Sequence, residues 1–402
     1  MNVQPVIDWL DGGATPASTP QDVLAELCKR LLEQGLDLYR VAVFVRTLHP
    51  NVLGRGFIWL RGREDIEVVE AAHGFRDTPL YQQSPMRIVF EQHVEVRRVL
   101  APGAELDFPV LEDFRKEGGT EFVSLPLRFT SGEVHAASFV TRQPGGFSEA
   151  DMAALRRILP PFTRIAEIYA MRRTAQNILD AYLGRQAGEK VLAGHIRRGD
   201  GEEIHAVIWF CDLRDSTRLA DAMSRDAFLR LLNEFFECVL EPVLAAGGEV
   251  LRFVGDAALA IFPVGGDAGD ACRRAVEAAR TAIARVEALN ARREQALRFG
   301  IGLHLGHVLY GNIGTPGRIE FTVIGAAANE AARIESLCKT LGVPLLLSAP
   351  VASHVQDCHS LGLHSLRGVG EPMELFTLAR SGVQSARPPH GNSEPGAGGR
   401  ST

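Results

Sequence analysis

The sequence of 402 residues lacks the features that would direct it to a membrane or to nucleic acid. It has no apolar run near the roughly 20 residues that span a bilayer. Its first residues, MNVQPVIDWL, show neither the basic start nor the apolar core of a secretory signal. Neither sign of charge dominates, because the net charge is −6 and the isoelectric point is near 6.1. These absences predict a soluble protein with no nucleic-acid partner and no membrane partner.

Cysteine is also scarce, and no two cysteines have the CxxC spacing of zinc ribbons and redox motifs. We therefore interpret them as reduced, mostly buried thiols and expect a cytoplasmic location. The composition, 46% hydrophobic and 23% charged, is typical of a soluble globular chain with two or three domains. The six cysteines are Cys28, Cys211, Cys238, Cys272, Cys338 and Cys358.

Composition and periodicity divide the chain into segments. We expect a flexible N-terminus over residues 1–20, a first domain over 21–160 and a helical linker over 161–202. A second domain is predicted over residues 203–380, where strands and helices alternate. The tail, residues 381–402, is rich in Pro, Gly and Ser and is expected to be disordered.

The first domain has the order helix, strands, helix. Its exit helix begins at GFSEADMAALRRIL, with Ser148 as N-cap and Asp151 three residues on. This order resembles a GAF-type sensory domain, which implies an unknown small ligand or a dimerisation role. His49, Trp59 and Cys28 are candidate ligand contacts, although turn and core roles are the simpler interpretation.

The linker helix RIAEIYAMRRTAQNILDAYLG has apolar residues near helical spacing. It either pairs with its copy in a dimer or packs on its own domain, and the sequence leaves both interpretations open.

The second domain begins with strand AVIWFCDL, a helix and the hairpin EVLRFVGDAALAIFP, and continues with a helix and strand LRFGIGLHLGHVLYGNIG. This β-α-β-β-α-β order predicts a ferredoxin-like unit of the α/β (α+β) class. Helices are expected to cover one face of its sheet.

Two aspartates follow strands of this unit: Asp212 comes after AVIWF, and Asp256 lies at the hairpin tip. The first strand and the hairpin are neighbours in such a unit, so both acids are expected above one surface. Two carboxylates with no local cation partner suit divalent cations, which prefer oxygen ligands and bridge phosphates. Taken singly, each Asp would be a cap or turn residue. Ser216 and Thr217, in FCDLRDST, either cap the next helix or contact phosphate.

FCDLRDST, VLRFVGDAALAIFP, FGIGLHLGHVLYGNIG and FTVIGAAANEAARIES together resemble the catalytic domain of class III nucleotidyl cyclases. The resemblance implies that Asp212 and Asp256 hold two Mg²⁺ or Mn²⁺ ions per site. It implies that Asn329 orients the ribose and that Arg333, on the same helix face, neutralises charge on the α-phosphate. Arg367, in LRGVGEP, corresponds to a basic residue that contacts the terminal phosphates.

Without this resemblance, Arg333 would be interpreted as a surface arginine paired with Glu330 or Glu335.

The base-reading positions depart from the adenylate-specific pattern. Arg252 stands where adenylate-specific members carry Lys, and with Thr322 at the other base-reading position the chain resembles the Thr-bearing subgroup. Arg and Lys can both donate to adenine N1, whereas guanylate-specific members usually have an acid at the position of Arg252. Arg252 could also be a strand-edge arginine that reaches solvent.

The resemblance implies a head-to-tail homodimer in which the metal acids of one chain face the ribose and phosphate residues of the other. The predicted function is the conversion of ATP to 3′,5′-cyclic AMP under control of the first domain. A guanylate cyclase and a catalytically silent signalling module are the alternatives.

Overall fold

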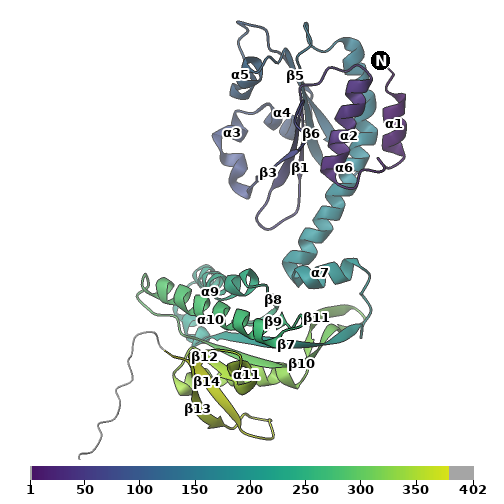
Figure 1. Ribbon diagram of the computed structural model, residues 1–402. Coiled ribbons are helices and arrows are strands. Elements are labelled where there is room, and N and C mark those ends of the chain that lie inside the picture. The colour runs from purple at the N-terminus through teal and green to yellow at the C-terminus, as the bar shows by residue number, and fades with distance from the viewer. Residues whose placement is uncertain (1, 380–402) are drawn as a thin grey trace, which may run out of the picture. The chain divides into compact units, whose positions relative to one another are not determined.

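The computed structural model describes residues 2–379, and the chain divides into two compact units, Met1–Gly194 and His195–Thr402 (Figure 1). The predicted disordered tail lies outside the described residues. Among residues 2–379, no helix is both long enough and apolar enough to cross a membrane.

The N-terminal unit is built on a six-stranded antiparallel sheet in the order β3-β2-β1-β6-β5-β4. Helices α1, α2 and α6 cover one face, and α4 and α5 pack on the other. The strands are β1 (Arg40–Arg46), β2 (Gly54–Leu60), β3 (Glu67–Ala71), β4 (Val96–Val99), β5 (Glu121–Arg128) and β6 (Val134–Thr141). The helices are α1 (Gln4–Asp11), α2 (Pro20–Glu33), α3 (Pro79–Gln82), α4 (Pro85–Gln92), α5 (Pro109–Lys116), α6 (Glu149–Leu183) and α7 (Arg185–Leu192).

The expectation of a flexible N-terminus over residues 1–20 is wrong. Residues 4–11 form α1, whose Val6 and Leu10 are each only 1% exposed and belong to the core of the N-terminal unit. The apolar residues of α1 pack against α2 and α6, and this burial provides the stabilisation that an isolated eight-residue helix lacks.

The helix α6 begins as predicted, because Ser148 and Asp151 form a capping box. We expected the first domain to end near residue 160, but α6 continues without a break through Pro160 and Pro161. Ile165 and Asn177 are buried beyond that point, so the first part of the predicted linker packs on its own unit. Other apolar residues of α6 are exposed, which leaves the dimer interpretation as a prediction; they are Ile168, Met171, Ile178 and Tyr182.

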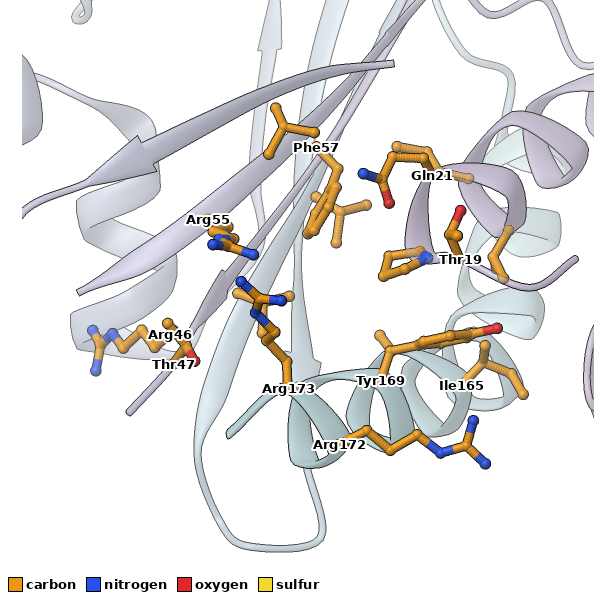
Figure 2. Close-up of a pocket in the computed structure, with 18 of the residues that line it drawn as sticks. Thr19, Gln21, Arg46, Thr47, Arg55, Phe57, Ile165, Tyr169, Arg172 and Arg173 are labelled. Atoms are coloured by element: carbon orange, nitrogen blue, oxygen red, sulfur yellow. The ribbon is translucent and has the colours of Figure 1, made fainter. Parts of the chain in front are cut away.

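A cavity of about 330 Å³ lies between this sheet and the helices α2 and α6 (Figure 2). Its walls are formed by residues of β1, β2 and β3 on one side and by one face of α6 on the other.

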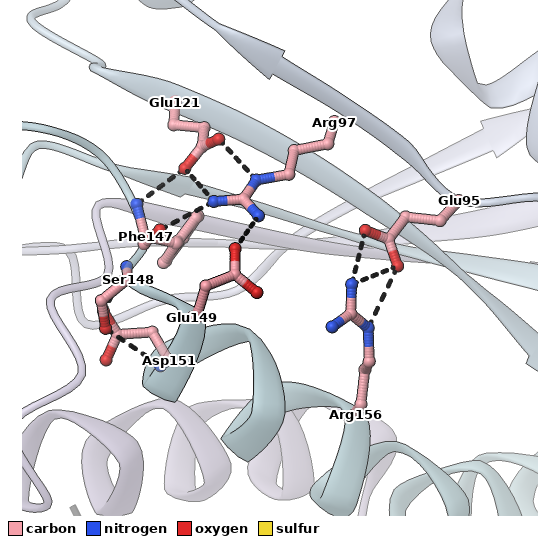
Figure 3. Close-up of polar contacts among 8 residues, drawn as sticks. All are labelled: Glu95, Arg97, Glu121, Phe147, Ser148, Glu149, Asp151 and Arg156. Carbon is pink, nitrogen blue, oxygen red and sulfur yellow. Dashed lines mark hydrogen bonds and ion pairs between the residues drawn. The ribbon is translucent and has the colours of Figure 1, made fainter.

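A partly buried ion pair fixes the start of α6 to the sheet (Figure 3). The Arg97 guanidinium lies 2.7 Å from the carboxylate of Glu121, which is only 2% exposed. The same guanidinium donates to the Phe147 carbonyl at 2.8 Å, and the Phe147 N–H donates to Glu121 at 2.7 Å. The segment that leads into α6 is thus held by hydrogen bonds to both the carbonyl and the N–H of Phe147.

The C-terminal unit is built on an eight-stranded sheet in the order β13-β14-β12-β10-β7-β9-β8, with β11 paired to β10. The strands are β7 (Gly201–Leu213), β8 (Glu249–Val254), β9 (Ala257–Pro263), β10 (Phe299–Thr315), β11 (Arg318–Ile324), β12 (Leu345–Ser348), β13 (Cys358–His364) and β14 (Met373–Leu378). The helices are α8 (Ser216–Ala222), α9 (Arg225–Ala245), α10 (Ala268–Asn290), α11 (Ala326–Leu341) and α12 (Ala349–Ala352).

The predicted βαββαβ unit is confirmed, because β10-β7-β9-β8 is the strand order of a ferredoxin-like sheet and these neighbours are antiparallel. The expectation that the helices of this unit cover one face of its sheet is confirmed, and a later helix covers the other face. Helices α9 and α10 cover one face, and α11 packs on the other (Figure 1). Gly302 permits the approach of α11, since a Cβ there would lie 2.5 Å from the Ala331 carbonyl oxygen.

Candidate active site

Asp212 and Asp256 are brought together by the pairing of β7 with β9. Asp212 lies opposite Ala257 in this ladder, and Asp256 is the residue just before it, in the turn between β8 and β9. The Leu213 N–H donates to the Asp256 carbonyl at 3.3 Å, which ties the turn to the end of β7. Gly255 allows the turn because its φ of 66° is left-handed. The two side chains interact, since the negative charge of Asp256 contributes to the raised pKa of the Asp212 carboxyl.

The face of the sheet on which Asp212 lies is set by strand alternation. Its neighbours Cys211 and Leu213 point into the core under α9 and α10. Asp212 therefore points to the opposite face, the one on which α11 packs.

The charges around Asp212 are partly buried and partly compensated. Burial, followed by the negative charge of Asp256, raises the pKa of Asp212 to about 6, and the nearby Arg214 opposes this shift. The Arg214 guanidinium lies 3.7 Å from Asp212 and 2.5 Å from the carboxylate of Glu335 on α11. The expectation that the two aspartates have no local cation partner is therefore wrong.

Glu335 is the second carboxylate that forms an ion pair with Arg214. Its side chain is 4% exposed, and burial raises its pKa to about 7 in spite of the arginine. Arg214 also donates to the Glu335 backbone carbonyl at 2.8 Å. This contact joins the end of β7 to the middle of α11.

An open cavity of about 360 Å³ lies over the two aspartates. Ser216 and Thr217, at the start of α8, line it together with Asp212 and Asp256. Lys339, from the C-terminal half of α11, adds a cation that sequence reasoning missed, and lies 3.7 Å from Asp215. The cavity thus combines two acids, two hydroxyls and nearby positive charge.

Asn329 and Arg333 lie elsewhere on α11. Both are exposed, and neither lines the cavity over the aspartates. The two suggested partners of Arg333 are engaged by other residues, since Glu330 pairs with His304 at 2.8 Å and Glu335 pairs with Arg214. Arg367 is exposed in the loop between β13 and β14, also outside the cavity.

Arg252 and Thr322 lie on the strands β8 and β11. Arg252 does not simply reach solvent, because its Nε lies 3.2 Å from the carboxylate of Glu320. Glu320 is two residues before Thr322 and therefore on the same face of β11. Thr322 is 3% exposed, and its hydroxyl has no hydrogen-bond partner among the described residues.

The sequence family of this segment is clear. A sequence model of the family described as the adenylate and guanylate cyclase catalytic domain matches residues 202–378. These residues match that family, and the name cyclase domain refers to this matched segment. The match includes the acid pair, α11 and the strands that carry Arg252 and Thr322.

Relatives of the chain have been found in mycobacteria. An uncharacterized protein of Mycobacterium tuberculosis (strain CDC 1551 / Oshkosh) is 34% identical over 214 residues, or 52% of this chain and 38% of that protein. An uncharacterized protein of Mycobacterium bovis (strain ATCC BAA-935 / AF2122/97) is 35% identical over 209 residues, or 51% of this chain and 38% of that protein. The matches to these relatives thus span 38% of their length.

Solved cyclase structures are similar to part of the chain. A bacterial light-regulated adenylyl cyclase is 28% identical, with a TM-score of 0.40 over 44% of this chain and 91% of that chain. The adenylyl cyclase CyaB from P. aeruginosa is 23% identical, with a TM-score of 0.40 over 45% and 97%. The guanylyl cyclase Cya2 is 25% identical, with a TM-score of 0.40 over 44% and 93%.

Sequence reasoning missed three charged residues of the cyclase domain: Arg214, Glu335 and Lys339. Arg214 stands inside the motif FCDLRDST, two residues after Asp212, so its charge was visible in the sequence. The direction of the Arg214 side chain was not visible in the sequence, because only the packing of α11 brings Glu335 close to Arg214. Lys339 had no sequence signal beyond its position on α11.

The direct contact between the two aspartates predicts a pKa change in the metal-free protein. Asp256→Asn removes a negative charge beside Asp212 and is expected to lower the pKa of the Asp212 carboxyl from about 6. The pKa is expected to stay above the ordinary value near 3.9, because burial is the larger cause. NMR titration of ¹³C-labelled aspartate measures the shift, with Asp212→Asn identifying the resonance.

Asp215→Asn is the matched control for this titration. Asp215 pairs with Arg298 and Lys339, and its charge is not among the main causes of the raised pKa of Asp212. The Asp212 titration should therefore be unchanged in Asp215→Asn. Equal shifts in the two variants would show that the effect is a general one of net charge.

Proposed function

We propose that the protein is an adenylate cyclase, which converts ATP to 3′,5′-cyclic AMP and pyrophosphate in signal transduction. The observation that carries this proposal is the pair Asp212 and Asp256 at the floor of an open cavity within the cyclase catalytic domain. In the reaction, the ribose 3′-oxygen forms a bond to the α-phosphorus. The bond from that phosphorus to the pyrophosphate oxygen breaks, and the hydroxyl proton passes to solvent.

The two carboxylates fit a divalent metal site. Carboxylate oxygens suit Mg²⁺ or Mn²⁺, and both burial and the charge of Asp256 raise the pKa of Asp212 in spite of Arg214, so a bound cation would stabilise the charged pair. No group of three or more His, Cys, Asp or Glu side chains that could hold a metal occurs within residues 2–379. Further ligands would thus be backbone, water or phosphate oxygens. Two bound ions would supply a lowered pKa for the 3′-hydroxyl and charge neutralisation at the phosphates.

The polar side chains around the cavity would hold the phosphates. Ser216 and Thr217 can donate hydroxyl hydrogen bonds to phosphate oxygens, and Lys339 adds positive charge at the same opening. Arg214 is occupied by Glu335 and Asp212, so its role is to position Asp212 rather than to bind substrate.

Residues for the ribose and the α-phosphate would come from a second copy of the chain. Asn329 and Arg333 are exposed and lie outside the cavity of their own domain, which supports their action on a partner's site. There Asn329 would orient the ribose, Arg333 would neutralise the charge that develops on the α-phosphate, and Arg367 would contact the terminal phosphates. A head-to-tail homodimer with two equivalent sites follows from this division.

Adenine is the base that Arg252 and Thr322 favour, because Arg252 can donate to the acceptor N1 and the Thr322 hydroxyl has an unused hydrogen-bonding capacity. The position of Glu320 favours the alternative, a guanylate cyclase. Its carboxylate lies 3.2 Å from Arg252 and could accept from the N–H groups of guanine. A silent module is less well supported, since Asp212, Asp256, Asn329 and Arg333 are all present.

The N-terminal unit is proposed to regulate the cyclase as a GAF-like sensor, by shifting the dimer between productive and unproductive arrangements. The continuous helix α6, which belongs to this unit and ends at Leu183, supports a role in transmission. A cytoplasmic location is supported by six free cysteines.

The activity itself is the first prediction. Purified full-length protein with Mg²⁺ or Mn²⁺ is expected to form cyclic AMP from ATP, and chromatography with mass detection identifies the product. Asp212→Asn and Asp256→Asn are expected to abolish turnover, and Asn329→Ala to lower kcat by about 10²-fold or more. Full activity of Asp212→Asn would contradict the metal assignment. No cyclic product from either ATP or GTP would overturn the enzyme proposal.

The shared site predicts complementation between inactive variants. In a heterodimer of Asp256→Asn and Arg333→Ala, one site carries both defects and the other carries neither. Mixing equal amounts should therefore restore about a quarter of wild-type activity. A mixture of Asp212→Asn and Asp256→Asn is the matched control and should stay inactive, because both sites remain defective. Recovery in neither mixture would argue against sites shared between chains.

The base-reading assignment predicts the behaviour of Arg252→Lys. Lys also donates to adenine N1, so kcat/KM for ATP is expected to hold or rise. Glu320→Gln tests the alternative, since it should leave ATP turnover in place and lower any GTP turnover. A switch of Arg252→Lys toward GTP would contradict the assignment of Arg252 to adenine. Steady-state kinetics with both nucleotides give these values.

A further inference from the structure

The cavity between the sheet and the helices α2 and α6 is separate from the cyclase reaction, since all of its lining residues belong to Met1–Gly194. Its volume of about 330 Å³ is in the range of small-molecule sites in proteins. The front of the chain therefore contains a preformed space of ligand size. Its chemistry indicates which class of ligand it would take.

Most of the cavity wall is apolar. Val43 and Phe57 face it from the sheet, and Phe162, Ile165 and Tyr169 face it from α6. Val43, Phe162 and Ile165 are also part of the buried core of the unit, so this wall is fixed by packing. Such a surface would bury the hydrocarbon or aromatic body of a ligand.

One end of the cavity is positively charged. Figure 2 shows Arg173 reaching from α6 toward Arg55 on β2, whereas Arg46 and Arg172 point away from this meeting point. Arg46 instead lies over the Phe90 ring, 4.8 Å from its centre. The cavity therefore presents two convergent guanidinium groups at one place.

These two arginines are incompletely neutralised. Arg55 pairs with Glu70 at 2.6 Å, but its Nε is buried without a hydrogen-bond partner among the described residues. Arg173 has no ion pair with any residue within 2–379. Among the described residues that line the cavity, none is Asp or Glu. An anion between the two guanidinium groups would supply the missing charge and accept hydrogen bonds from both.

We propose that this cavity binds an amphipathic organic carboxylate, with its apolar body against the α6 wall and its carboxylate between Arg55 and Arg173. The guanidinium fork matches the planar carboxylate group. A neutral molecule of the same shape fills the space but leaves Arg173 without an anion and the Arg55 Nε without an acceptor. The site rests on the N-terminal unit alone and does not depend on the cyclase reaction.

Octanoate and 1-octanol test the proposal, because they share one alkyl chain and differ in charge. Titration calorimetry of the full-length protein is expected to show one octanoate per chain and binding of 1-octanol weaker by about tenfold or more. Arg173→Gln is expected to weaken octanoate binding by about tenfold, and Arg55→Gln by a similar factor. Ala170→Phe, which places a ring in the cavity, should abolish binding of both compounds.

Arg172→Gln is the matched control. It removes the same charge from the neighbouring position of α6, but Arg172 points away from Arg55 (Figure 2). Its affinity for octanoate should equal that of the wild type. Three results would overturn the proposal: no octanoate binding, equal affinity for octanoate and 1-octanol, or equal weakening by Arg172→Gln and Arg173→Gln. Circular dichroism and thermal melting would show that each variant is folded.

Discussion

The antiparallel register of β7 with β9 is the constraint on which the candidate active site depends. It places Asp212 opposite Ala257 and hence beside Asp256. Strand side chains alternate, so a slip of one residue would turn Asp212 into the core and bring a hydrophobic residue to the cavity. The buried set that includes Val207, Trp209 and Cys211 prevents such a slip, since it would have to leave the core under α9 and α10. The hydrophobic core thus sets the direction of the Asp212 side chain.

The helix α11 links the two halves of the proposed chemistry. Its buried face brings Glu335 to Arg214, and through Arg214 it constrains Asp212. Its exposed face carries Asn329 and Arg333, which are directed to another molecule in the proposed dimer. In the proposed dimer, one helix would therefore constrain Asp212 of its own chain and present the ribose and phosphate residues to a partner. The small residues Gly302 and Ala331 allow the close packing that this arrangement needs.

In both units, the packing pairs some cationic side chains with acids and leaves others available to bind an anion. In the N-terminal unit, Arg97 is engaged by Glu121 and Glu149 and fixes the start of α6, whereas Arg173 further along the same helix has no acidic partner among the residues that the structure describes. In the cyclase domain, Arg214 is engaged and Lys339 is directed to the cavity opening. The engaged arginines stabilise the fold, and those with unused capacity mark the places where anions would bind.

Sequence alone determined the order of strands and helices in the cyclase domain, the Ser148 capping box and the meeting of Asp212 with Asp256. These follow from local patterns and from the short list of topologies open to a βαββαβ chain. Only the tertiary structure decided that residues 4–11 are a packed helix, that α11 covers the second face of the sheet, that Arg252 pairs with Glu320 and that Arg214 lies beside the acids. Each of these depends on a contact between separate elements, and even Arg214, only two residues from Asp212, takes its direction from Glu335 on α11. The geometry of such a contact depends on how whole elements pack, which no local pattern of residues specifies.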